Sequence, residues 1–199
     1  MDCRTHETQP PARSTALSGD EDAGLIGRVA AGDRHAFDVL YRAYFHRLTR
    51  FLNRMTRSVQ LIEEIVNDVM LVVWQKAYSY DGSCKVSTWV FAIAYRKACK
   101  ALGQLDEPLE YVADAAASAQ AGQPERQFEQ LSLAHALDAA LESLPLAQRA
   151  AFQLTFYHDM SCAEIAAVMD CPVNTVKTRL FHARRRLALL FEGQLEGRP

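Results

Sequence analysis

Apolar residues recur every three or four positions through residues 25–103 and again through residues 131–191. The clearest stripe comprises Leu25, Ile26, Val29, Phe37, Leu40, Tyr41, Tyr44, Leu48, Phe51 and Leu52. This spacing gathers apolar side chains on one face of an amphipathic helix, whereas strands would need strict alternation, of which no useful length occurs. The pattern therefore predicts an all-α protein built from two small helical domains.

The segment between the two periodic blocks has a different composition. Residues 104–130 combine Gly, Pro, Ala, Gln and acidic residues, which is typical of a flexible connection. They hold 6 acidic residues and 1 basic residue, against 9 and 12 in residues 20–103 and 7 and 7 in residues 131–199. We therefore expect a disordered tail over 1–19, an N-terminal helical bundle over 20–103, a flexible acidic linker over 104–130 and a C-terminal domain over 131–199.

The apolar runs and the cysteines bear on the cellular compartment. The first residues carry acids and prolines where a secretory signal needs an unbroken apolar stretch, and the longer apolar runs, such as Val69–Trp74, have only six or seven residues. The five cysteines are scattered without a CxxC pair, so a disulfide framework is not expected. The sequence therefore predicts a cytoplasmic protein.

Ser161 followed by Glu164 has the pattern of a capping box, in which each side chain hydrogen-bonds the other residue's backbone N–H. A helix is expected to start at Ser161 and to end before Pro172, and a second helix should begin near Val173. The residues expected to pack the second helix on the first are Val173, Val176, Leu180, Ala183 and Leu187. The opposite side is polar, which suits a helix-turn-helix that reads DNA in the major groove. The alternative is a solvated amphipathic helix, because any surface helix has a charged outer face.

The same stretch also raises the question of a metal site. Cys162 and Cys171 lie nine residues apart, with His158 upstream and His182 downstream, and these residue types are zinc ligands. That step is not a usual zinc-knuckle spacing, and no second close pair exists. We therefore expect no metal and no cofactor, with the cysteines in packing or turn positions and the histidines at the surface or at helix ends.

Two sets of motifs follow one another along the chain. The N-terminal set is YRAYFHRLTRFLNRM, IEEIVNDVMLVVWQKAYSYDG and VSTWVFAIAYRKA, and the C-terminal set is LESLPLAQRAAFQLTFYHDMSCAEIAAVMDCPVNTVKTRLFHARRRL. Together they resemble regions 2 and 4 of the extracytoplasmic-function (ECF) sigma factors of the sigma-70 family, and in motif most of all the envelope-stress type. The resemblance implies an alternative sigma factor that binds core RNA polymerase and directs promoter recognition, DNA melting and transcription initiation, without catalysis of its own.

The resemblance assigns roles to three groups of residues. The helix matching Ile62–Tyr78 would bind polymerase through Glu64, Asn67, Asp68, Leu71 and Gln75. The loop of residues 80–86 and a helix capped by Ser87 or Thr88 would capture the melted promoter strand, through Ser83, Lys85, Ser87, Thr88, Trp89, Tyr95, Arg96, Lys97 and Lys100. The upstream promoter element would meet Arg149, Ser161, Asn174, Thr175, Lys177, Thr178, Phe181, Arg184 and Arg185. Aromatic rings can stack on unpaired bases while cations follow the backbone, which fits strand capture.

Plainer interpretations of the first two groups stay open. The polymerase-binding helix could be an ordinary core helix, and we expect at least one of Trp89 and Phe91 to be core. Three residues also depart from the family pattern: Asn67 replaces a frequent glutamine, Arg96 a frequent asparagine and Asn174 a frequent glycine. Because Asn174 adds a side chain at the DNA surface, the upstream promoter sequence cannot be taken from relatives.

The resemblance also implies partners. These are core RNA polymerase, promoter DNA and a dedicated anti-sigma factor, often membrane-anchored, which would hold this otherwise cytoplasmic protein at the inner membrane. No small-molecule substrate is expected, because no GxSxG, HExxH, P-loop or paired-carboxylate signature points to an enzyme. The alternative function is that of a free-standing helix-turn-helix regulator, in which residues 25–103 would sense a signal or form a dimer.

Two further hypotheses concern the linker and the cysteines. Acidic residues of the linker could lie in the basic RNA-exit path of polymerase and imitate a nucleic-acid backbone; they are Asp106, Glu107, Glu110 and Asp114. Cys84, near the capture loop, and Cys171, in the turn, could make activity redox-sensitive, although inert thiols are the simpler interpretation because neither has a close cysteine in sequence.

Overall fold

Every regular element of the described chain is a helix. The computed structural model describes residues 19–103 and 137–196, with side chains described up to residue 190. The expected all-α class is therefore confirmed, while the expected tail and acidic linker lie outside the described residues. Within the described ranges, no helix is long and apolar enough to cross a lipid bilayer.

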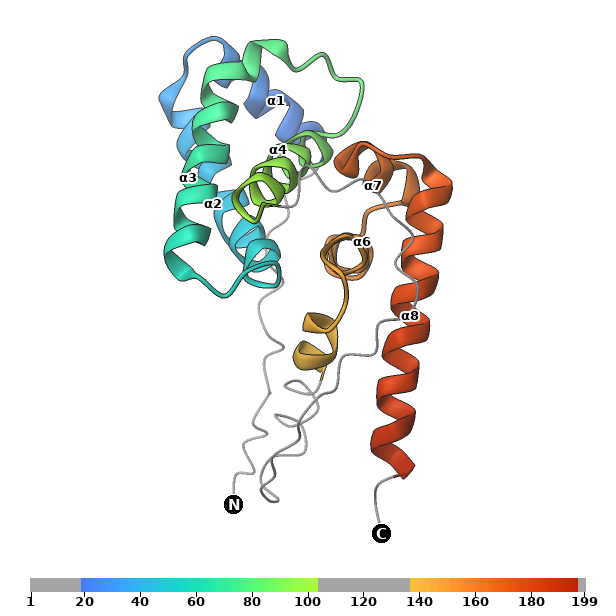
Figure 1. Cartoon of the computed structure of the whole chain (residues 1–199). Coiled ribbons are helices and arrows are strands. Elements are labelled where there is room, and N and C mark those ends of the chain that lie inside the picture. The colour runs from blue at the N-terminus through green and yellow to red at the C-terminus, as the bar shows by residue number, and fades with distance from the viewer. Residues whose placement is uncertain (1–18, 104–136, 197–199) are drawn as a thin grey trace, which may run out of the picture.

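The N-terminal unit is a helical bundle in which α2 and α3 begin at side-chain caps. Its elements are α1 (Gly19–Ala30), α2 (Arg34–Asn53), α3 (Val59–Lys76), the 3₁₀ turn η1 (Ala77–Ser79) and α4 (Val86–Ala101), as Figure 1 shows. The Asp33 carboxylate caps α2 by accepting hydrogen bonds from two backbone N–H groups of the first turn. The Ser58 hydroxyl caps α3 in the same way, so this helix starts before Ile62, where the sequence predicted it, and changes to η1 before Tyr78.

The C-terminal unit has the helix-turn-helix that the sequence predicted. A helical segment over residues 137–142 is followed by α6 (Leu146–Phe156), α7 (Cys162–Met169) and α8 (Val173–Glu196). The capping box is present: the Ser161 N–H donates to Glu164 Oε2 over 2.8 Å, and the Glu164 N–H donates to Ser161 Oγ over 3.3 Å. Asp170 ends α7 in the left-handed region, at φ 49°, so the chain turns directly into α8.

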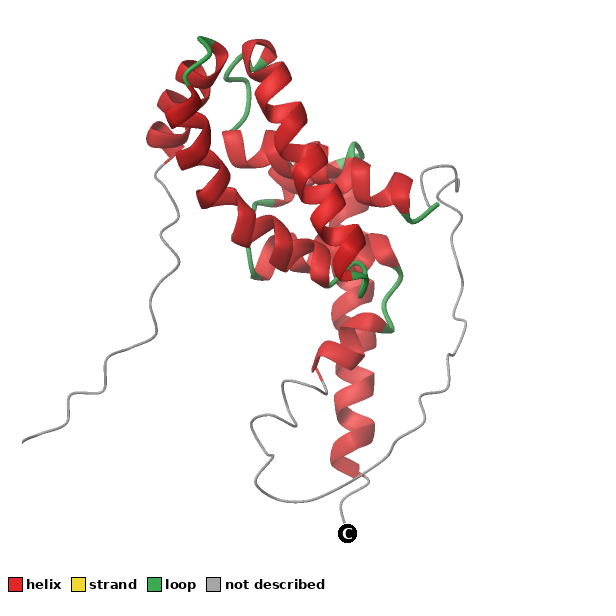
Figure 2. Ribbon diagram, turned by 90° about the vertical axis from the view of Figure 1, so that its left-hand side faces the viewer, coloured by secondary structure: helices red, strands yellow, loops and turns green. Residues whose placement is uncertain are grey.

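Helix α8 is long and packs on two different neighbours. Val176 and Leu180 are buried in the core that α7 shares, whereas Ala183 and Leu187 are buried against Ala140, Leu141 and Leu144. Figures 1 and 2 show α8 continuing well beyond α7. Val173, which was expected in the same row, is 38% exposed at the first residue of α8.

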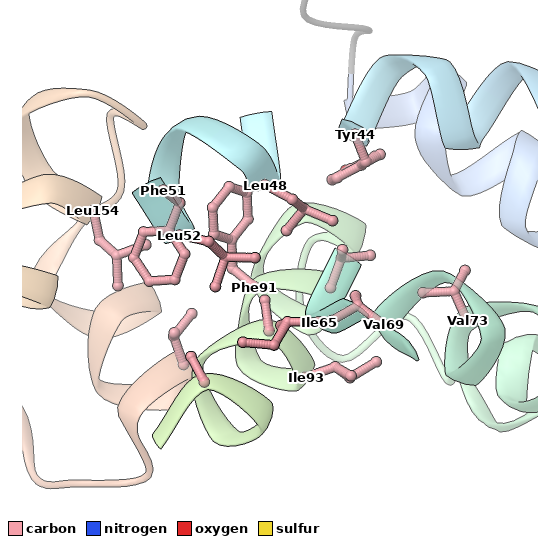
Figure 3. Close-up of a cluster of buried hydrophobic side chains, with 14 of the residues drawn as sticks. Tyr44, Leu48, Phe51, Leu52, Ile65, Val69, Val73, Phe91, Ile93 and Leu154 are labelled. Atoms are coloured by element: carbon pink, nitrogen blue, oxygen red, sulfur yellow. The ribbon is translucent and has the colours of Figure 1, made fainter. Parts of the chain in front are cut away.

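The two units share one hydrophobic core. Phe51 of α2, Phe91 of α4 and Leu154 of α6 are fully buried together, and Figure 3 shows Leu154 beside Phe51. All ten residues of the predicted apolar stripe are buried or half-buried. Helix α4 also packs along α7, so the helix predicted to capture the melted strand lies against the helix-turn-helix of the second unit.

Candidate polymerase and promoter interfaces

The predicted polymerase-binding residues form an exposed face of α3. Glu64, Asn67 and Gln75 are exposed, and Leu71 is an exposed apolar side chain among them. Behind them the helix is buried through Ile62, Ile65, Val66, Val69, Met70 and Val73. Helix α3 is therefore a core helix with one exposed polar-edged face, and polymerase binding by that face stays a prediction.

Two hydrogen bonds tie this face to neighbouring helices. The Tyr41 hydroxyl donates to Asn67 Oδ1 over 3.2 Å. Lys97 of α4 donates to Asp68 Oδ2 over 2.7 Å, which joins a predicted strand-capture residue to a predicted polymerase-binding residue. This ion pair links α3 to α4.

The capture loop is a tight turn held by its own side chains. Gly82 takes φ 75°, which suits glycine, and Asp81 Oδ1 accepts the Ser83 N–H over 2.9 Å. This hydrogen bonding holds the pKa of Asp81 below its usual range. The Tyr80 hydroxyl donates to the Cys84 carbonyl, and its ring lies 5.7 Å from that of Trp89. The loop is thus shaped before any strand binds.

Helix α4 begins earlier than the sequence predicted. Neither Ser87 nor Thr88 caps it: the N-cap position is Lys85, without a side-chain cap, and the helix starts at Val86. Val86 is buried, so the core fixes this end of the helix in place of a hydroxyl cap. Thr88 is buried as well, with its hydroxyl unpartnered among the described residues.

The remaining residues predicted to capture the strand differ in solvent exposure. Ser83, Lys85, Arg96 and Lys100 are exposed, whereas Ser87, Trp89, Tyr95 and Lys97 are half-buried. Phe91 is fully buried, which confirms that at least one of the two aromatic residues belongs to the core.

The polar side of α8 is open to solvent. Its exposed residues are Asn174, Lys177, Thr178, Phe181, Arg184 and Arg185, with Thr175 half-buried beside them. Arg184 stands over the ring of Phe156 at 5.5 Å, which positions its guanidinium by a cation–π contact. Ser161 is also exposed, although its hydroxyl serves the capping box.

Arg149, which was also expected to meet the upstream element, is not part of the exposed face of α8. Its guanidinium donates to the carbonyls of Arg54, Glu142 and Leu144 over 2.8–3.1 Å, so it fastens the segment before α6 to the end of α2. Burial lowers the pKa of Arg149, and the Glu142 carboxylate offsets this in part. In this arrangement Arg149 holds backbone together and is half-buried.

Contacts between the two units cover part of α4. Lys85 forms an ion pair with Glu164 of α7 over 2.8 Å, and this pairing helps to hold the pKa of Glu164 below its usual range. Burial raises the pKa of the Tyr95 hydroxyl, which Cys99 and Cys171 raise further and Arg179 of α8 opposes. Single-sequence patterns did not reveal these contacts, because the paired residues are far apart in the chain.

His158 lies just after the end of α6, as the expected helix-end position requires, and it is half-buried. Its ring lies 4.5 Å from Phe91 and 6.0 Å from Phe51, between the two units. Burial lowers its pKa from 6.5 to about 4, and Arg47, Arg50 and Arg54 add to the shift. His182, by contrast, is exposed on α8.

Within the described ranges, the cysteines do not form a metal site with neighbouring side chains. No three His, Cys, Asp or Glu side chains gather there to hold an ion. Arg179 donates to the Cys171 Sγ over 3.3 Å. Burial and the nearby Asp81 raise the pKa of the Cys84 thiol, which favours the inert-thiol interpretation for this residue.

Comparison with known proteins gives the family. The model of Sigma-70 region 2 matches residues 40–106, and that of Sigma-70, region 4 matches residues 134–187. The ECF RNA polymerase sigma-E factor of Escherichia coli is 30% identical over 176 residues, covering 83% of this chain and 92% of the relative. The RNA polymerase sigma-H factor of Pseudomonas aeruginosa is 26% identical over 181 residues, covering 86% of this chain and 94% of that relative.

Solved structures show the same fold. CnrH in complex with the cytosolic domain of CnrY superposes with a TM-score of 0.66 at 23% identity, covering 87% of this chain and 99% of CnrH. The sigma factor RpoE of Bartonella quintana, in complex with the anti-sigma factor NepR, superposes with a TM-score of 0.53 at 24% identity. The match covers 78% of this chain and 96% of RpoE. The chain therefore belongs to the ECF sigma factors of the sigma-70 family, and its function is that of an alternative sigma factor, not of a free-standing regulator.

Proposed function

We propose that the exposed faces of α3, α4 and α8 divide the steps of initiation between them. Helix α3 binds core polymerase, the loop of residues 80–86 with α4 captures the melted strand, and α8 contacts the upstream element. The observation that carries this division is the outer side of α8, where Asn174, Lys177 and Arg185 are exposed opposite a buried apolar row. The phosphodiester chemistry belongs to the polymerase.

Strand capture by α4 requires the packing between α4 and α7 to open. Lys85 pairs with Glu164 while its side chain stays 67% exposed, whereas Tyr95 is half-buried where Arg179 of α8 acts on its hydroxyl, so the packed units restrict access mainly to Tyr95. Core polymerase would supply the free energy of opening by binding the separated form more tightly.

The direct test is transcription in vitro with core polymerase on a genomic DNA library, followed by mapping of the start sites. We expect start sites behind a common promoter element only when this protein and the core enzyme are both present. Transcripts that begin at the same sites without it would contradict the proposal.

Removing Arg185 is expected to weaken promoter binding evenly across promoter sequences. In Arg185→Ala holoenzyme, affinity should fall by about threefold to tenfold, and the slope of log affinity against log salt should decrease by about one, because one phosphate contact is lost. Filter binding at several salt concentrations measures both quantities. Arg34→Ala, an exposed position at the start of α2, is the matched control and should leave both unchanged.

Neutralising the linker is expected to act at the polymerase and not at the promoter. Replacing Asp106, Glu107, Glu110 and Asp114 with Asn or Gln removes four of the six acids in residues 104–130. If the linker lies in the basic RNA-exit path, polymerase affinity should fall and abortive-transcript yield should change. Unchanged values of both would dismiss this role.

We further propose a cytoplasmic protein restrained by an anti-sigma factor that holds it at the inner membrane. The support is that CnrH was solved with the cytosolic domain of CnrY, and the Bartonella quintana sigma factor with the anti-sigma factor NepR. Fractionation of cells before and after removal of the anti-sigma factor tests this: the protein should move from the membrane fraction to the soluble fraction.

A further inference from the structure

A polar cavity lies where the end of α2 meets the helical segment of residues 137–142. It measures about 470 Å³ and is lined by Arg50, Asn53, Arg54, Arg57, Asp138, Leu141 and Glu142. A second hollow of about 430 Å³ is lined by His46, Thr49, Arg50 and Asn53, so the two share a wall. The cavity is therefore walled by both units, with guanidinium groups on one side.

The positive charge of this cavity is only partly neutralised. Arg57 donates two hydrogen bonds to the Glu142 carboxylate, from Nη2 to Oε2 and from Nε to Oε1, the latter over 2.9 Å. Arg54 Nη2 is 3.6 Å from Asp138, which is too long for a hydrogen bond. Arg50 forms no ion pair with any described residue. Three guanidinium groups thus face two carboxylates, and only one pair is well matched.

Arg54 is held firmly although it lacks a good acceptor. Its guanidinium lies 3.8 Å from the centre of the Tyr157 ring, so stacking fixes the plane of the group. Its Nη1 has no hydrogen-bond partner among the described residues. A fixed guanidinium loses little conformational entropy on binding an anion.

The arginines of the cavity also act on His158. After burial, the causes that lower the pKa of His158 are Arg47, Arg50 and Arg54, and two of these arginines line the cavity. An anion in the cavity would meet a net positive potential.

We propose that this cavity binds a small oligophosphate, held by Arg50 and Arg54 with the Asn53 amide as an additional donor. Guanidinium forks match phosphate oxygens in pairs, and residues four apart on a helix lie about 5–6 Å apart, within reach of one oligophosphate. Leu141 is the sole apolar residue of the lining, so the site recognises phosphate groups and offers no apolar surface for a nucleobase. Because both units form the walls, the ligand stabilises their packed arrangement.

Calorimetric titration of the full chain with pyrophosphate tests the site at about 0.1 M salt, where diffuse attraction is largely screened. We expect saturable binding of one pyrophosphate per chain. Arg50→Ala should weaken it by about tenfold or more. Arg42→Ala is the matched control, because it removes the same charge from the same helix at an exposed residue that pairs with Asp38 outside the cavity.

Other outcomes decide the proposal as well. Arg50 is exposed, so both variants should keep the circular dichroism of the parent, and Arg50→Lys should bind with intermediate affinity. Adenosine triphosphate should bind no more tightly than tripolyphosphate. Absence of saturable binding, an equal loss in Arg42→Ala, or an Arg50→Ala defect confined to single-stranded oligonucleotides would each overturn it. The titration needs neither polymerase nor promoter, so its result is independent of the proposed function.

Discussion

Replacing Leu71 with aspartate is expected to weaken binding to core polymerase by about a hundredfold, or about 3 kcal/mol. Leu71 is 52% exposed at the centre of the α3 face, between the exposed polar residues Asn67 and Gln75. An apolar side chain with a polar surround is the usual composition of an interface hot spot, and a carboxylate there would be buried without a partner. Fluorescence anisotropy of the labelled protein with core enzyme measures the change.

Val59→Asp provides the control for that experiment. Val59 is 59% exposed at the first residue of the same helix, more than three turns away from Leu71. An acidic residue at a helix N-terminus is favourable, so this variant should fold and bind as the parent does. If both variants lost affinity equally, the interface would not be centred on Leu71.

Local sequence rules predicted the elements that local interactions determine. Ser161 and Glu164 are three residues apart, so their reciprocal hydrogen bonds could be inferred from the sequence and are present. The start of α4 was missed because the burial of Val86 by distant residues fixes it, not a hydroxyl beside it. Propensity and capping are weak against tertiary packing of this kind.

The packing of the two units was not predictable for the same reason. Arg57 and Glu142 are 85 residues apart, and Arg149 reaches the Arg54 carbonyl across 95 positions. Neither pair has a periodic signature, since a single sequence shows only neighbours at helical or strand spacing. The family resemblance supplied the exposed faces of α3 and α8, but not the contact between Lys85 and Glu164 that covers part of α4.

Acidification is expected to separate the two packed units through His158. The ring packs beside Phe51 and Phe91, and burial lowers its pKa to about 4 from 6.5, with Arg47, Arg50 and Arg54, in or just after α2, adding to the shift. A depressed histidine pKa means that the separated form binds the proton more tightly. The stabilisation of the packed form by neutral His158 is therefore complete above about pH 6.5. It is lost as the pH falls towards 4, which lowers the free energy of unfolding by about 3 kcal/mol in total.

His158→Phe should remove this dependence, because phenylalanine can pack against the same two rings but cannot be protonated. The measurement is the free energy of unfolding in urea between pH 7 and pH 4.5, and the slope in this window should flatten in the variant. Carboxylates with lowered pKa values, such as Asp33, Asp81 and Glu164, titrate mainly below this window and are common to both proteins. His182→Phe changes an exposed histidine of α8 and should keep the parental slope. An unchanged slope in His158→Phe would show that acid acts on the packed units through another group.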